Sequence, residues 1–281
     1  MRSLALLVVM VFVSLACSPT SPSQAPSPAQ EGLTYPVVAS SDLALGVQRV
    51  LVALYDGDTQ PVASPDLPVT LEFHSPGGGR PISTEAGFMW TIPELRGVYR
   101  AEVAFEETGE WAVVVHPEGL PVTDPAPFTV QPEAATPQVG DPAPRSETPT
   151  AAEGSLAEVS TDTAPDPRFY QLSIAEAVTS GRPTVVVFAT PRFCTSQVCG
   201  PTLELIKEEA PKYPDANFVH VEVYDLEAAP EQLEPVPAVG EWGLPSEPWV
   251  FVVDRDGRVS ARFEGALAPR ELQEALEEAA A

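Results

Sequence analysis

The stretch from residue 185 to 201, VVVFATPRFCTSQVCGP, constrains the fold of this chain more than any other. It begins with an apolar, β-branched run that is typical of a buried parallel strand. A loop with two cysteines, Cys194 and Cys199, follows, and a helix is expected from about residue 200. The N–H groups and the dipole of a helix N-terminus stabilise a thiolate, which is the nucleophilic form of cysteine. The stretch therefore predicts an α/β domain with thiol–disulfide chemistry.

The residues around this stretch predict a complete α/β domain from 168 to 281. Ser173 and Glu176 have the spacing of a capping box, which indicates a short helix ahead of the strand at 184–189. The further elements expected are a helix at 200–210, a strand at 217–224, a helical turn at 236–242, an antiparallel hairpin with strands at 249–253 and 258–263, and a helix at 271–280.

This order of elements resembles the thioredoxin fold. Residues 188–201 are similar to the active-site segment of that family, and Pro248 stands where the family has a cis-proline ahead of its hairpin. The resemblance implies a thiol–disulfide oxidoreductase with Cys199, Cys194 and Pro248 as its site residues. Cys199-Gly-Pro-Thr aligns with the family motif, so Cys199 is expected to be the nucleophile at the helix terminus and Cys194 an added resolving thiol.

The chain departs from the family pattern in its cysteine spacing, which is Cys-x4-Cys instead of Cys-x2-Cys. Residues five apart on one helix point about 140° from each other, so Cys194 must lie in the loop if the two cysteines pair. The family's buried acid is replaced by an apolar residue of 185–187, which leaves proton transfer to water or to Glu247. An alternative interpretation is a permanent structural disulfide in a non-enzymatic envelope adaptor or binding protein.

Residues 34–131 predict a second, all-β domain of the immunoglobulin-like sandwich type. Strands are expected at 47–55 and 69–74, followed by a hairpin of 97–105 with 111–115. His74 and His116 lie in this domain, and a copper or zinc site with Met89 is conceivable. No two ligand types recur at a metal-like spacing, so we expect no metal here and no cofactor elsewhere.

The N-terminus predicts export and a lipid anchor. Arg2 precedes an apolar stretch at 4–16 that is too short to span a bilayer but suits a signal peptide, taken here as residues 1–16. Ser14-Leu-Ala-Cys17 resembles a bacterial lipobox, although Ser14 stands where the pattern prefers Leu or Val. The alternative is an ordinary secretory signal. Use of Cys17 as an acylation site would leave one cysteine pair in a compartment that permits disulfides.

Two segments lack apolar periodicity and are rich in proline, serine and alanine. Residues 17–33 are expected to be a disordered tether and residues 132–167 a Pro/Ala-rich linker between the domains. The formal net charge of −25 argues against nucleic acid as a partner, because it repels phosphate backbones. The sequence thus predicts a lipid-anchored, extracytoplasmic two-domain protein that acts on client proteins with thiols or disulfides.

Overall fold

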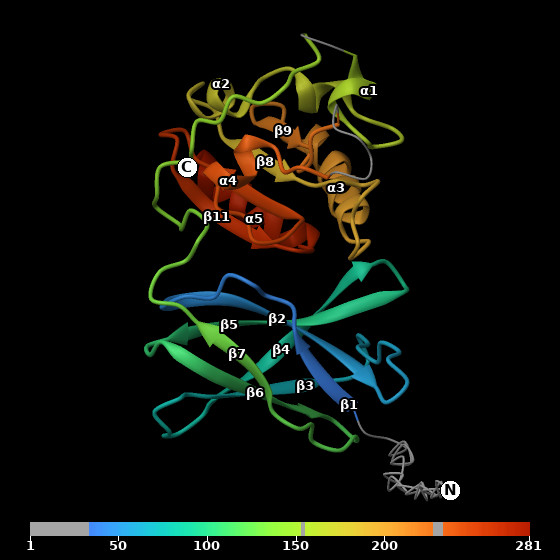
Figure 1. Cartoon of the computed structure of the whole chain (residues 1–281), viewed down its shortest axis with the longest axis vertical. Helices are drawn as coiled ribbons and strands as arrows, with labels where there is room; N and C mark the ends of the chain where they lie inside the picture. Colours follow the sequence, from blue (N-terminus) through green and yellow to red (C-terminus); the bar gives the residue numbers. More distant parts are fainter. Residues whose placement is uncertain (1–33, 153–154, 227–232) are drawn as a thin grey trace, which may run out of the picture. The chain divides into compact units, whose positions relative to one another are not determined.

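The structure is a computed structural model that describes residues 34–152, 155–226 and 233–281 (Figure 1). The predicted signal peptide, the tether and Cys17 lie outside these ranges. No helix in the described ranges is long and apolar enough to cross a membrane.

Residues 34–131 form an all-antiparallel, barrel-like β-sheet, which we call the β-sheet domain. Within the described residues its strands are β1 (Thr34–Val38), β2 (Gly46–Asp56), β3 (Val69–His74), β4 (Ile82–Ile92), β5 (Arg96–Phe105), β6 (Gly109–Pro117) and β7 (Ala126–Val130). They follow the order β1-β2-β5-β4-β3-β6-β7. Beyond the last strand, the Gln131 N–H donates to the Leu43 carbonyl at 2.8 Å, which brings the two ends of the sheet together.

The long strand β4 joins the two halves of this sheet. Its first half pairs with β3 and its second half with β5. The hairpin expected between 97–105 and 111–115 is wrong, because β5 pairs with β2 and β4 whereas β6 pairs with β3 and β7. The short turn before Gly109 crosses from one half to the other. Alternation of apolar residues identifies strands but does not say which strands pair, so the sequence did not predict that the chain crosses between the two halves of the sheet after β5.

The C-terminal residues form a mixed α/β domain. Its described elements are α1 (Leu156–Val159), η1 (Pro167–Tyr170), α2 (Ile174–Val178), β8 (Thr184–Phe188), α3 (Cys199–Glu209), η2 (Ala210–Lys212), β9 (Asn217–Val221), α4 (Pro237–Glu241), β10 (Trp249–Val253), β11 (Val259–Glu264) and α5 (Pro269–Ala280). The sheet order is β11-β10-β8-β9, with β8 parallel to β9 and β10 antiparallel to β8 and β11. The strands and the hairpin expected from the sequence are confirmed.

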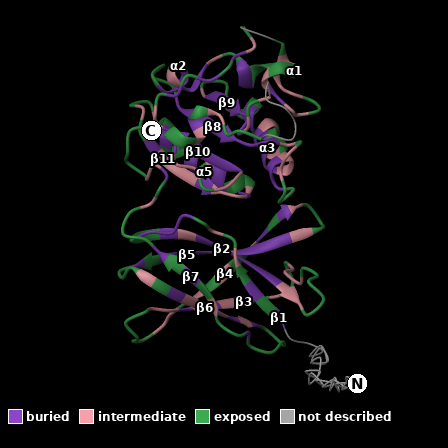
Figure 2. Ribbon diagram, in the orientation of Figure 1, coloured by how far each residue is buried: buried purple, intermediate pink, exposed green. Residues whose placement is uncertain are grey.

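Helices cover both faces of this α/β sheet. On one face, Val185 and Val187 of β8 share a core with side chains of α3 and α5; on the other, Val186 and Phe188 share a core with α2 and α4. Every residue of β8, β9 and β10 is buried, as the purple strands of Figure 2 show. Burial on both faces explains why residues 185–188 of β8 and all of β10 are apolar instead of alternating with polar residues.

The described part of the segment expected to be a linker, 132–152 and 155–167, packs along the α/β domain. The Gly140 N–H donates to the Val259 carbonyl at 2.8 Å, and the Ala143 N–H donates to the Gly257 carbonyl at 2.9 Å. Ala143 is 6% exposed and belongs to the core beneath α2. Backbone hydrogen bonds can pair a proline-rich segment without leaving a periodic side-chain pattern, so the sequence did not indicate this packing.

Buried and half-buried ion pairs connect the β-sheet domain to the α/β domain. Arg49 Nε lies 2.8 Å from Glu271 Oε1, and Arg100 Nη1 lies 2.6 Å from the same oxygen. Arg262 Nη1 lies 2.9 Å from Asp42 Oδ2. Burial alone would raise the pKa of Glu271, but the charge and hydrogen bond of Arg49, with the hydrogen bonds from the Ala268 N–H and Arg100, outweigh it and hold this pKa below its usual value.

Candidate functional site

The two cysteines lie at the junction between β8 and α3. After β8 the chain turns so that the Cys194 N–H donates to the Thr190 carbonyl at 3.0 Å. Gln197 then takes a left-handed conformation with φ 63°, and α3 begins at Cys199. A tight loop therefore carries Cys194 back toward the first turn of the helix, as the spacing argument requires.

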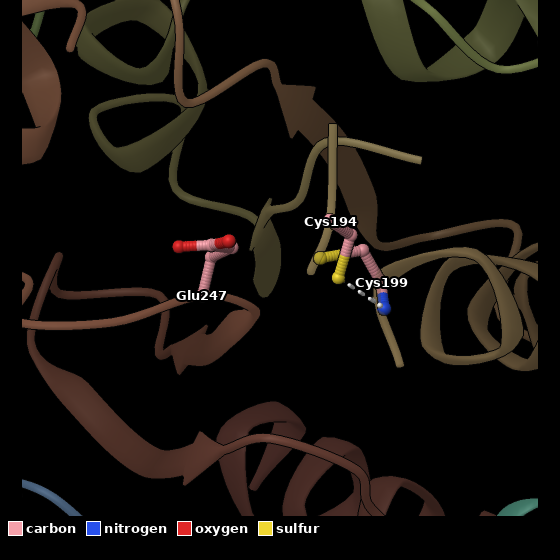
Figure 3. A group of neighbouring side chains, drawn as sticks. All are labelled: Cys194, Cys199 and Glu247. Carbon is pink, nitrogen blue, oxygen red and sulfur yellow. Dashed lines mark hydrogen bonds between the residues drawn. The ribbon is translucent and has the colours of Figure 1, made fainter. Parts of the chain in front are cut away.

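The two thiols differ sharply in their exposure. Cys199 is 0% exposed and belongs to the core between the sheet, α3 and α5, whereas Cys194 is only partly buried. Both are free thiols, and their sulfur atoms lie within 4.8 Å of each other (Figure 3). An incoming reactant can therefore reach Cys194, while Cys199 is covered behind it.

Hydrogen bonds stabilise Cys194 as a thiolate. The Cys199 N–H points at the Cys194 sulfur from 3.3 Å, and Ser196 Oγ lies 3.2 Å from it. The hydrogen bond from the Cys199 thiol, helped by these neighbours, lowers the pKa of Cys194 to about 5. The pKa of Cys199 is raised, because its proton is shared with Cys194 and because it is buried. At neutral pH this arrangement holds one thiolate and one thiol.

Glu247 and Pro248 complete the surroundings of the thiols. The Glu247–Pro248 peptide bond is cis, as the sequence position led us to expect. A carboxylate oxygen of Glu247 lies within 4.8 Å of both sulfur atoms, and Figure 3 shows the three side chains. Burial, and then the charge of Cys194, raise the pKa of Glu247. An acid that titrates above its usual range is suited to exchange a proton with a nearby thiol.

Residues 170–280 match the family of thioredoxin-like domains. This part of the chain is a thioredoxin-like domain. No curated protein sequence matches the chain. Two solved structures show low similarity. A hypothetical protein from Pyrococcus horikoshii OT3 is 16% identical, and the match covers 35% of this chain and 89% of that protein with a TM-score of 0.25. The Lin-41 filamin domain is 17% identical, and the match covers 36% of this chain and 93% of that domain with a TM-score of 0.23. At these TM-scores neither similarity supports an argument about fold or function.

The two cysteines differ from expectation in which sulfur is exposed and which receives the backbone N–H. Cys199 was expected to be the attacking thiol because it stands at the helix terminus. The structure does place Cys199 there, but with its sulfur buried and its pKa raised. The helix terminus instead directs a backbone N–H at Cys194. Spacing alone could not reveal this, because the turn at Gln197 decides which sulfur faces the N–H groups.

Three donor atoms in the thioredoxin-like domain, from Cys194, Cys199 and Glu247, lie close enough together to contact one metal ion. Within the described ranges no fourth residue is grouped with these three, so the set has the number of protein ligands of an open zinc site and not of a closed structural one. The same three side chains form a thiol pair beside an acid. His220 of β9 is buried and hydrogen-bonded to Tyr170 and to the Ala189 carbonyl.

The histidines of the β-sheet domain lie apart from this site. His74 Nε2 is 2.8 Å from a Glu72 oxygen, and His116 Nε2 is 3.7 Å from the other oxygen of the same carboxylate. Met89 belongs instead to an apolar cluster with Val198 of the cysteine loop. The structure therefore does not bring Met89 together with the two histidines. Neither Val198 nor Ser196 carries a sequence signal that would have placed it in the site.

Proposed function

We propose that the protein is a thiol–disulfide oxidoreductase that works through Cys194 and Cys199. The observation that carries this proposal is the asymmetry of the pair, with a partly exposed, hydrogen-bonded Cys194 in front of a buried Cys199 whose pKa is raised. A permanent structural bridge needs no such difference between its two sulfurs, whereas exchange needs one thiol to attack and a second to resolve.

The chemistry proceeds in two displacements. In the reducing direction, the Cys194 thiolate attacks a client disulfide, forms a mixed disulfide and releases one client sulfur as a thiolate. Cys199 then loses its proton to Glu247 or water and attacks the Cys194 sulfur. The bond between Cys194 and the client breaks, the client leaves as a dithiol, and a Cys194–Cys199 disulfide remains. The oxidising direction is the reverse of these steps.

The low pKa of Cys194 favours the oxidising direction. A thiol of low pKa is a good leaving group, and a stabilised thiolate makes the reduced pair more stable relative to its disulfide. We therefore expect the protein to donate its disulfide to client thiols. Its reduction potential should lie above the value of about −270 mV that is typical of a reducing thioredoxin.

Trapping of mixed disulfides tests the proposal. Cys199→Ser leaves the attacking thiol without its resolving partner, so it should accumulate disulfide-linked clients through Cys194 on a non-reducing gel. Cys194→Ser is the matched control and should accumulate few disulfide-linked clients, because the Cys199 sulfur is buried. If neither variant collects partners and the potential of the pair lies below about −300 mV, the pair is a structural bridge and the protein a non-enzymatic adaptor.

We further propose that the protein is exported and anchored to the membrane by lipid on Cys17, and that its clients are extracytoplasmic proteins. Support comes from the apolar stretch at 4–16 that ends at Cys17. The β-sheet domain would be an immunoglobulin-like module that presents the thioredoxin-like domain to its clients. Cys17→Ser should move the protein from the membrane fraction to the soluble extracytoplasmic fraction. A variant that still sediments with membranes would contradict the anchor.

A further inference from the structure

The end of the cysteine loop is packed against the β-sheet domain. Val198 is the last residue before α3 and is 9% exposed. It belongs to an apolar cluster in which most of the other buried side chains come from β2, β4 and β5 of the β-sheet domain: Leu51, Ala53, Met89 and Val98, together with Ala266. The thioredoxin-like domain alone therefore does not bury this residue. The side chain of Val198 ties the loop to the neighbouring domain.

The backbone at Val198 also carries the groups that stabilise the thiolate. The Cys199 N–H donates to the Cys194 sulfur at 3.3 Å, and the Val198 N–H faces the same sulfur and lies 3.4 Å from Ser196 Oγ. Both N–H groups are fixed to the Cα of Val198 or its neighbour. A shift of the Val198 side chain would move these donors directly.

A second contact holds the middle of the loop. Arg96, the first residue of β5, donates from Nη1 to the Ser196 carbonyl at 3.3 Å. Ser196 in turn has its hydroxyl 3.2 Å from the Cys194 sulfur. Between Ser196 and Val198 stands Gln197, whose left-handed φ of 63° is unfavourable for a residue other than glycine. Such a conformation persists when residues on both sides are held, as Ser196 and Val198 are here.

We propose that the β-sheet domain is a structural part of the redox site, because β2, β4 and β5 hold Val198 and Arg96 holds Ser196 in the positions that direct N–H groups at the Cys194 sulfur. This deepens the proposed thiol exchange and concerns the same cysteine. Val98, Met89 and Arg96 are positioning residues that act on Cys194 through the loop. The β-sheet domain thus sets the reactivity of the thiol, whatever it does toward clients.

The test is the pH dependence of Cys194 alkylation in the reduced full-length protein. Iodoacetamide labelling is followed by mass spectrometry of the peptide that contains Cys194. The ionisable groups that face this sulfur are Cys199 of α3, Glu247 before β10 and Tyr224 after β9, and no variant in the test changes them. In the valine variants, which leave every charge of the protein unchanged, a shift of the midpoint therefore reports the position of the loop.

Val98→Ala removes two methyl groups from the cluster around Val198. The matched control is Val115→Ala, which also removes two methyl groups, but from the main core of the β-sheet domain, which does not include Val198. Val98→Ala should raise the Cys194 midpoint by about half a pH unit or more, which slows labelling about threefold at low pH. Val115→Ala should leave the midpoint unchanged. Equal shifts in both variants, or no shift in Val98→Ala, would overturn the proposal.

Arg96→Ala keeps the test informative if a core variant fails to fold, since Arg96 is not fully buried. It should shift the midpoint in the same direction, and Arg96→Lys should restore part of it. An unchanged midpoint in Arg96→Ala would remove Arg96 from the proposal. A shifted midpoint in a protein that traps no clients would support the positioning of the loop and contradict the proposed exchange, so the two failures remain distinguishable.

Discussion

The hydroxyl of Tyr170 lies 2.7 Å from Nδ1 of His220 inside the thioredoxin-like domain. His220 Nε2 lies 3.0 Å from the Ala189 carbonyl, which only accepts, so Nε2 carries the hydrogen and Nδ1 accepts from Tyr170. Ser160 Oγ lies 2.8 Å from the same hydroxyl. Both ring nitrogens are therefore satisfied in the neutral form, and a second proton would have to displace one of these bonds.

Acid should destabilise the protein through His220. Burial lowers the pKa of His220 from 6.5 to about 4, so between these values the unfolded chain binds a proton that the folded chain does not. Stability should therefore fall as the pH drops from 6.5 to 4, by up to about 3 kcal/mol from this residue. His220→Gln should show a flatter decline in urea unfolding over that range. An identical slope in both proteins would contradict the assignment.

The two cysteines should react with an alkylating reagent at different rates in the folded, reduced protein. Cys194 should react with iodoacetamide along a profile whose midpoint reflects its pKa of about 5, while Cys199 stays protected because it is buried and its pKa is raised. Mass spectrometry of the two peptides across pH 4 to 9 measures both. Protein unfolded in urea is the control, in which both thiols should titrate near their ordinary value of about 8.5. Equal rates in the folded protein would contradict the asymmetry.

Glu247→Gln should separate the two displacements. It removes the acid that can take the proton from Cys199, so the resolving step should slow about tenfold or more at neutral pH. The first attack by Cys194 should be nearly unchanged at neutral pH, because this thiol, with its pKa of about 5, is already ionised there. A mixed disulfide between Cys194 and a small aromatic thiol, followed by release of that thiol in a stopped-flow experiment, measures the resolving step. Glu247→Asp, which keeps an acid, should recover part of the rate.

The cysteine pair shows what the sequence could and could not predict. The apolar run before Cys194 and the capping residues Ser173 and Glu176 predicted the strand and the helix that the structure contains, because burial and capping leave local patterns. The different surroundings of Cys194 and Cys199 go with the backbone turn at Gln197 and with the packing of Val198 against another domain. Contacts between residues far apart in the chain leave no such pattern, so only the structure revealed them.

Breaking the ion triad around Glu271 should destabilise the folded chain. Glu271→Gln leaves the largely buried Arg49 without its charged partner and weakens the contact to Arg100, at a cost of about 3 kcal/mol in the free energy of unfolding. Glu274→Gln in the same helix is the matched control, because its pair with Arg270 is exposed and should matter little. Urea unfolding of both variants measures the difference. Equal stabilities would show that the triad does not hold the two domains together.

The hydrogen bonds between residues 140–143 and β11 decide where the thioredoxin-like domain can be cut. β11 is the last strand on its side of the sheet, and the backbone groups of Val259 and Gly257 at its start are paired with Gly140, Asp141 and Ala143. A recombinant fragment that starts at 168 would leave these groups bare, and an open strand edge invites pairing with other chains and aggregation. We therefore expect a fragment that begins before residue 140 to stay soluble under conditions in which one that begins at 168 associates with itself.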